Sequence, residues 1–176
     1  VLHGAHFDSQ MTPPPIFQKF FLPYFKDFAV KLREARKTMI FHGDSDTSNL
    51  LELIREAGFE VADCFATAPL VPCTLRQARD AWGNQITIWG GIPSIILDPN
   101  FEQEQFLKYI VELARTIEPG DHVILGVSDN VLPGADFNRV ELISEMLLEV
   151  GDYPLEAKRV EKWLKEKGTS KLAHKG

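Results

Sequence analysis

The sequence predicts an α/β fold, arranged as the C-terminal half of a (β/α)8 TIM barrel with four parallel strands and outer helices. Four apolar runs of strand length are each followed by a helical pattern, which is typical of a parallel sheet. Polar residues gather where these runs end, at the edge on which barrels carry their sites. A closed barrel needs eight such units and typically about 250 residues. The polar residues 1–10, with no strand before them, favour a half barrel over an open, doubly wound sheet.

Length and composition limit the class of protein. The chain has 176 residues and a net charge of −6, so a nucleic-acid surface is not expected. No apolar run approaches the roughly 20 residues of a membrane span. Two cysteines without a disulfide pattern point to the cytoplasm. We expect residues 1–151 to form the half barrel and residues 152–176 a C-terminal helix and tail.

The first helix is expected to begin at Pro13–Pro15 and to run to about Arg36. Aromatic residues recur on one helical face, which predicts packing against the core: Phe17, Phe21, Tyr24 and Phe28. Pro23 lies inside this segment and predicts a kink.

Strands and helices then alternate. The strands are expected at residues 38–42, 60–65, 85–89 and 122–125, the third ended by Gly90-Gly91. Helices are expected after each strand, at residues 49–58 and 74–82, across Phe106–Ile117 with an end at Pro119-Gly120, and across Val140–Val150 with an end at Gly151, followed by a last one at 157–167. Thr74 and Gln77 form a capping box at the start of the second of these helices.

The residues that end the strands are the candidates for a site. His42 and Asp44 are two apart, so an extended backbone would place both side chains on one face. The alternative is a hydrogen bond that braces the turn. Asp129 and Asn130 follow the last strand and suit either a site or a simple turn.

Three further residues have two interpretations each. Asp8 and Gln10 either line the pocket or order a loop. Trp89 belongs either to the core or to the wall of an apolar cavity that binds a cofactor. Cys64 is expected to be a small buried hydrophobic side chain.

Several short segments resemble the uroporphyrinogen decarboxylase superfamily, from about residue 6 to residue 151. The segments are His6-Phe7-Asp8-Ser9-Gln10, Phe20-Phe21-Leu22-Pro23-Tyr24, Phe41-His42-Gly43-Asp44, Ile88-Trp89-Gly90-Gly91-Ile92, and Ile124-Leu125-Gly126 with Asn130-Val131-Leu132-Pro133-Gly134. That superfamily contains tetrapyrrole decarboxylases and corrinoid-dependent methyltransferases, such as methylcobalamin:coenzyme M methyltransferase. The resemblance implies a (β/α)8 barrel with its site at the carboxyl end.

The resemblance also implies a metal site. The corrinoid methyltransferases hold zinc with His-x-Cys at one strand end and a second Cys near the last strand. Here His42 matches the His, while Asp44 and Asp129 stand at the two Cys positions. We therefore expect His42, Asp44 and Asp129 to converge around a zinc ion, although carboxylates are harder ligands than thiolates.

The expected function is methyl transfer between a corrinoid, carried by a partner protein, and a small acceptor or donor. The alternative is a decarboxylase of a tetrapyrrole or another carboxylated substrate. The decarboxylases carry a His near the position of Asp129, and substrate carboxylates need basic residues, whereas Arg76 and Arg139 lie in expected helices. A second alternative is a half barrel that serves as a binding or assembly module. A missing N-terminal half or a second copy of the chain would complete the sheet.

Overall fold

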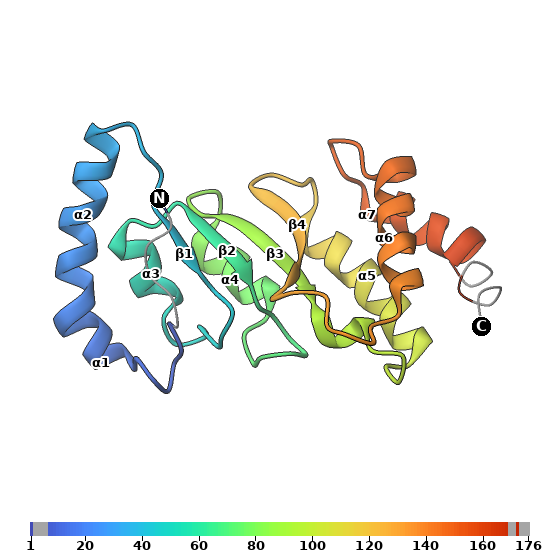
Figure 1. Cartoon of the computed structure of the whole chain (residues 1–176). Helices are drawn as coiled ribbons and strands as arrows, with labels where there is room; N and C mark the ends of the chain where they lie inside the picture. The colour runs from blue at the N-terminus through green and yellow to red at the C-terminus, as the bar shows by residue number, and fades with distance from the viewer. Residues whose placement is uncertain (2–6, 169–171, 173–176) are drawn as a thin grey trace. The chain divides into compact units, whose positions relative to one another are not determined.

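The computed structural model describes residue 1, residues 7–168 and residue 172. These residues form two compact units. The first contains Val1–Pro93 and His122–Asn130, and the second contains Ser94–Asp121 and Val131–Gly176. The sheet lies in the first unit (Figure 1). The division expected after residue 151 does not coincide with these units, and it stays a prediction.

The sheet has four parallel strands in the order of the sequence. They are β1 (Ile40–His42), β2 (Val61–Phe65), β3 (Thr87–Pro93) and β4 (Val123–Ser128). Each pairs in parallel with the next, so all four carboxyl ends lie at one edge. The predicted parallel arrangement is confirmed.

Two of the strands are longer than the sequence indicated. β3 continues through both glycines to Pro93, and β4 continues to Ser128. The expectation that Gly90-Gly91 ends the third strand is therefore wrong, and Trp89 lies within the strand rather than at its end. Gly90 has a φ of +143°, and a Cβ there would lie 2.6 Å from the backbone nitrogen of Phe65. Gly90 therefore allows the backbones of β2 and β3 to approach each other closely, and it does not end the strand.

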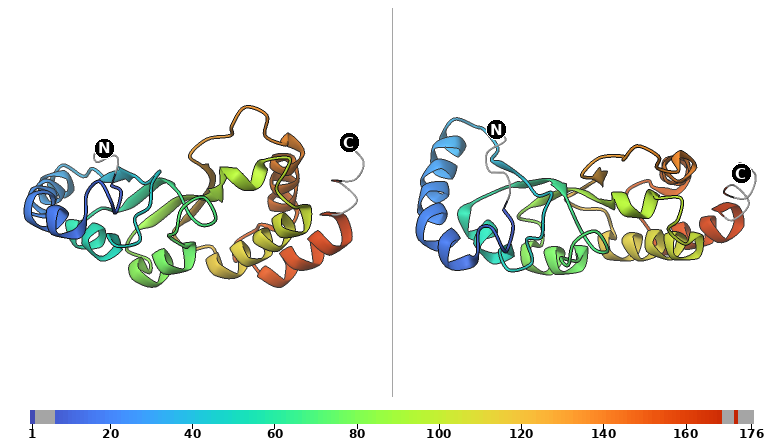
Figure 2. Two further views of the ribbon diagram at one scale, coloured as in Figure 1. Left: turned by 90° about the horizontal axis from the view of Figure 1, so that it is seen from below. Right: turned by 60° about the horizontal axis from the view of Figure 1, so that its bottom comes forward.

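The helices of the first unit are α1 (Pro14–Ile16), η1 (Phe17–Phe21, a π-helical turn), α2 (Leu22–Glu34), α3 (Leu51–Ala57) and α4 (Leu75–Trp82). Both views in Figure 2 show α3 and α4 on the same side of the strands. Trp82 packs edge-on against Phe41 of β1 and Phe65 of β2, and its indole N–H donates to the carbonyl of Leu51. The predicted capping box at Thr74 and Gln77 is present.

The aromatic face predicted for the first helix is only partly right. Phe21 is 36% exposed but stacks on Phe17 and Phe25, whereas Tyr24 is 52% exposed. The buried residues of α2 are instead Leu22, Phe25, Ala29 and Leu32. The π-helical turn Phe17–Phe21 explains the difference, because it fits an extra residue into one turn and shifts every later side chain around the helix.

The opposite face of the sheet carries residues that are only partly covered. Trp89 and Ile124 are register partners on β3 and β4, and they are 44% and 48% exposed. His42 and Asp63 are register partners on β1 and β2, and both are half-buried. This face thus combines polar residues with a large apolar surface.

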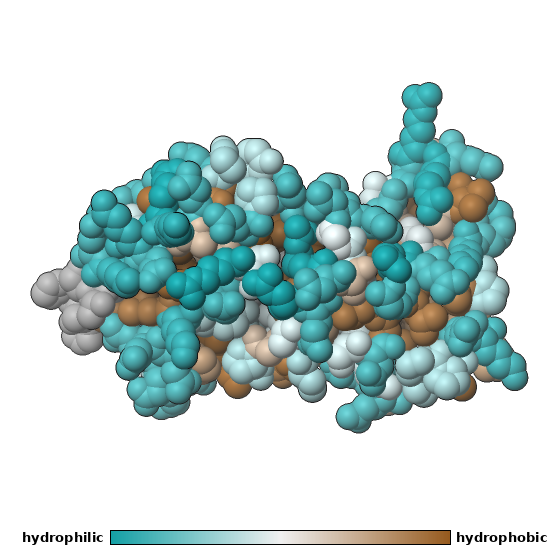
Figure 3. All heavy atoms as spheres, turned by 180° about the vertical axis from the view of Figure 1, so that it is seen from behind, coloured by the Kyte–Doolittle hydropathy of each residue, from teal (hydrophilic) through white to brown (hydrophobic). Residues whose placement is uncertain are grey.

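The second unit is helical. It contains η2 (Ser94–Leu97), α5 (Gln103–Ile117), α6 (Phe137–Val150), α7 (Ala157–Trp163) and η3 (Leu164–Gly168). Arg139 of α6 is buried and donates to the backbone carbonyl of Ile96 in η2 and to those of Asp98 and Phe101 in the segment that follows. In the surface view of Figure 3, hydrophobic side chains emerge in patches between polar ones. No helix within the described ranges is long and apolar enough to cross a membrane.

Candidate metal centre

The site is built around His42, the last residue of β1. Its ring is half-buried, and Nδ1 lies 3.0 Å from Oδ2 of Asp63, its register partner on β2. A carboxylate only accepts hydrogen bonds, so we assign the Nδ1 proton to this contact. The bond fixes the ring and its tautomer, as carboxylate partners do for histidines that bind metals.

The other ring nitrogen faces two more carboxylates. Nε2 lies 3.6 Å from Oδ2 of Asp44 and 3.7 Å from Oδ1 of Asp129. Within the described residues, no Lys or Arg lies within 4.0 Å of the carboxylates of Asp44, Asp63 or Asp129. A neutral ring would direct the Nε2 lone pair at two anionic groups. A cation between the ring and the carboxylates would make this arrangement favourable.

Asp129 is held in place by the residue before it. Ser128 is fully buried, and its Oγ donates to the carbonyl of Phe65 on β2 at 2.6 Å and accepts from the amide of Gly91 at 3.2 Å. The hydroxyl thus links β4 to β2 across β3. It fits there because Gly90 has no side chain, since a Cβ would lie 2.9 Å from the Ser128 Oγ. This link brings the end of β4 toward β1 and β2.

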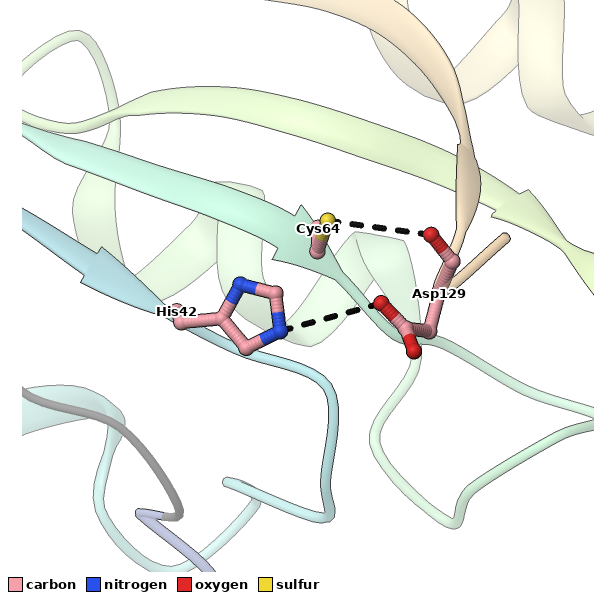
Figure 4. Close-up of side chains that lie close together, drawn as sticks. All are labelled: His42, Cys64 and Asp129. Atoms are coloured by element: carbon pink, nitrogen blue, oxygen red, sulfur yellow. Dashed lines mark hydrogen bonds and ion pairs between the residues drawn. The ribbon is translucent and has the colours of Figure 1, made fainter. Parts of the chain in front are cut away.

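Cys64 also belongs to the site, so its assignment as a buried hydrophobic side chain is wrong. It is partly exposed, and its Sγ lies 3.7 Å from the backbone carbonyl of Asp129 (Figure 4). Its φ is +52°, and the register of β2 against β3 shifts between Ala62 and Phe65. Such a bulge re-aims side chains, which alternation alone would not predict. Burial, followed by the charges of Asp63 and Asp129, raises the pKa of the Cys64 thiol to about 11.

The donor atoms fit a divalent cation. Within residues 7–168, one group of three, His42, Cys64 and Asp129, has its ligand atoms all within 4.8 Å of one another. A nitrogen at about 2.0–2.1 Å and an oxygen at about 2.0–2.2 Å from a tetrahedral zinc ion lie about 3.3–3.5 Å apart. Nε2 of His42 and Oδ1 of Asp129, at 3.7 Å, would need to approach by only a few tenths of an ångström. Asp44 contacts the histidine but is not a member of the group, and its ligand role stays a prediction.

The remaining candidates lie elsewhere or have local roles. Asp8 accepts from the amides of Gln10 and Met11 and so orders a turn, with Gln10 exposed. Asn130 donates to Oδ2 of Asp129 at 3.1 Å. Roles in substrate or cofactor binding for these residues and for Trp89 stay predictions. His6, part of the first resembling segment, lies outside the described residues.

Sequence reasoning missed Asp63, assigned Cys64 to the core, and placed Ser128 beside Asp129 at the end of the last strand without giving it a role. The signal for Asp63 was present, because a carboxylate interrupts the apolar second strand at the position that pairs with His42. The orientation of Cys64 depends on the bulge in β2, and the link made by Ser128 depends on its contacts with β2 and β3, neither of which follows from the local sequence pattern.

Comparison with known proteins adds the family. The family model of uroporphyrinogen decarboxylase (URO-D) matches residues 6–149. Among solved structures, a methyltransferase from Methanosarcina mazei is similar, with 14% identity and a TM-score of 0.48, over 93% of this chain. The chain spans 39% of the length of that methyltransferase. None of the curated proteins matches. The four parallel strands with their helices are thus the C-terminal half of a (β/α)8 barrel, and the chain belongs to the uroporphyrinogen decarboxylase family.

Proposed function

We propose that this chain is the metal-binding half of a methyltransferase. The enzyme would move a methyl group between a corrinoid, carried by a partner protein, and a small acceptor or donor. One observation carries the proposal: the ring of His42, fixed by Asp63 at 3.0 Å, directs Nε2 at carboxylate oxygens 3.6 and 3.7 Å away. A divalent cation neutralises such a cluster and gains a nitrogen ligand from it.

The residues have distinct tasks in this function. A zinc ion bound here would act as a Lewis acid on the heteroatom that gains or loses the methyl group. His42 and Asp129 would hold the ion, and Asp44 remains the expected third oxygen ligand. Asp63 would orient the ring of His42 toward the ion.

The basic residues of the chain support methyl transfer over decarboxylation. A tetrapyrrole substrate carries several carboxylates, which need Arg or Lys side chains as partners. In the described part of the chain, the carboxyl edge of the sheet presents three carboxylates with His42 as their ionic partner. The guanidinium of Arg139 is already bound to backbone carbonyls.

The exposed sheet face supports the proposed partners. Trp89 and Ile124 present large apolar side chains, 44% and 48% exposed, on the face that a closed barrel would bury. An N-terminal half of the barrel, or a second copy of the chain, would cover them.

The test compares the same substitution at two histidines of the full-length protein. His42→Asn removes the candidate ligand. His122→Asn is the control, because this histidine precedes β4 at its amino end and contacts Thr87. Zinc content is measured together with methyl transfer in both directions, from methylated oxygen or nitrogen compounds to cob(I)alamin and from methylcobalamin to a thiol. The proposal expects His42→Asn to lose both and His122→Asn to keep both.

Other results would assign the site differently. Loss of turnover with normal zinc content would make His42 an acid–base group. Release of CO2 from uroporphyrinogen, without methyl transfer, would establish the decarboxylase. A full-length protein with neither zinc nor turnover would overturn the proposal and favour a binding or assembly module.

A further inference from the structure

The sulfur of Cys64 lies beside the proposed metal site, and the proposed function gives it no role. The strand ends that carry His42 and Asp129 offer nitrogen and oxygen ligands only. The sulfur comes from β2, the strand that lies next to β1. Cys64 Sγ lies within 4.8 Å of the ligand atoms of both His42 and Asp129.

We infer that Cys64 binds the metal ion as a thiolate, together with His42 Nε2 and an oxygen of Asp129. This inference rests on the proposed function and specifies the metal. A mixed sulfur, nitrogen and oxygen set suits Zn²⁺, whereas Mg²⁺ and Ca²⁺ prefer oxygen ligands alone. Asp44 then lies beside the ion as an outer carboxylate, 3.6 Å from the ring of His42.

The backbone of β2 aims the sulfur into the site. Regular alternation would place Cys64 on the face opposite to Asp63, toward the helices. The positive φ of +52° and the register shift before Phe65 prevent this. Such a conformation is unfavourable for a residue with a Cβ. Figure 4 shows the result: Cys64 and His42 reach from neighbouring strands toward Asp129.

The second cysteine provides a contrast within the same unit. Cys73 is fully buried, and its Sγ contacts the carbonyl of Thr74. It belongs to no group of ligand atoms in the described part of the chain. The two cysteines therefore form a matched pair, one inside the proposed site and one outside it.

Binding is an acid–base exchange with no change of oxidation state. The S–H bond breaks, the proton passes to water, and the sulfur lone pair forms the bond to the metal. The hydrogen bond from the thiol to the carbonyl of Asp129 is lost in the same step. Metal binding should therefore release one proton more when Cys64 is present than when it is absent.

The experiment uses the full-length protein, stripped of metal and titrated with Co²⁺. A thiolate ligand gives a near-ultraviolet sulfur-to-cobalt charge-transfer band, which nitrogen and oxygen ligands do not give. We expect the band in the unaltered protein and in Cys73→Ser, and its loss in Cys64→Ser. Affinity for Co²⁺ should fall about 10-fold or more in Cys64→Ser, since even outer partners of a metal site contribute about 10–100-fold.

A second measurement uses the unaltered protein, so that the inference can be tested even if Cys64→Ser does not fold. Bound Zn²⁺ should protect Cys64 from alkylation by iodoacetamide, read by peptide mass. Co²⁺ binding without the charge-transfer band, or zinc that leaves alkylation of Cys64 unchanged, would overturn the inference while leaving the proposed function in place. A protein that binds neither ion would overturn both.

Discussion

Gly90 tests the link that assembles the site. In Gly90→Ala, the added Cβ would lie 2.6 and 2.9 Å from the backbone N and O of Phe65, and 2.9 Å from Oγ of Ser128. A φ of +143° adds strain of about 1–3 kcal/mol for a residue other than glycine. Crowding of a packed site adds about 1–3 kcal/mol, because two of the three atoms in the way belong to the backbone and cannot move aside. We expect a total loss of roughly 2–6 kcal/mol.

Gly83 is the matched control. It also has a positive φ, +54°, but a Cβ there would meet no atom within 4 Å. Gly83→Ala should therefore lose only the backbone-strain part of the free energy of unfolding, about 1–3 kcal/mol. The two variants are compared by urea unfolding of the full-length protein, where m is about 1–3 kcal/mol per M. The midpoint of Gly90→Ala should lie about 1 M below that of Gly83→Ala, given an excess of roughly 1–3 kcal/mol. Equal midpoints would refute the close approach of β2 and β3.

Two further predictions concern buried groups. Burial raises the pKa of Cys73 to about 11, above the ordinary value of 9.0, so the folded state holds its proton when the unfolded chain has lost it. This contribution to stability is complete below pH 9 and is lost as the pH rises to about 11, by about 2–3 kcal/mol. Between pH 9 and pH 11, the urea midpoint of Cys73→Ala should fall less with rising pH than that of the unaltered protein. Midpoints that fall equally in both proteins would contradict the prediction. Arg139→Met should cost about 3 kcal/mol or more, because three carbonyls lose their donor, that of Ile96 from a buried bond and those of Asp98 and Phe101 from part-buried bonds. Arg79, whose bond to the carbonyl of Gly83 is exposed, is its control, and Arg79→Met should cost less than about 1 kcal/mol; a similar loss in both variants would contradict this role for Arg139.

The fold followed from the sequence because its determinants are local. Each strand is an apolar run with turn residues at its end, and each helix has its own period and caps. The errors arose where one local irregularity acts at a distance. The π-helical turn Phe17–Phe21 moved the buried face of α2, and the close approach at Gly90 let β3 continue through two glycines.

The site was predicted in part for the same reason. Parallel strands bring their carboxyl ends together, so the spacing of His42 and Asp44 and the position of Asp129 sufficed to place them side by side. Asp63 and Cys64 lie on β2, inside an apparently structural strand. Their contribution depends on the register with β1 and on the bulge before Phe65, both of which are set by pairing rather than by the residues themselves.

The charges around His42 bear on what the proposed metal would do. Cys64 as a thiolate and Asp129 as a carboxylate would together cancel the charge of a divalent ion, with His42 neutral. Asp63 and Asp44 would add two negative charges just outside the bonds, at 3.0 and 3.6 Å from the ring. One thiolate donates less electron density to the metal than two would, so this ion would be the stronger Lewis acid. A stronger Lewis acid polarises a neutral oxygen or nitrogen effectively. It also binds an incoming thiolate tightly, which makes the sulfur a weaker nucleophile. Within the proposed function, this donor set therefore favours withdrawal of a methyl group from a neutral heteroatom over its delivery to a thiol.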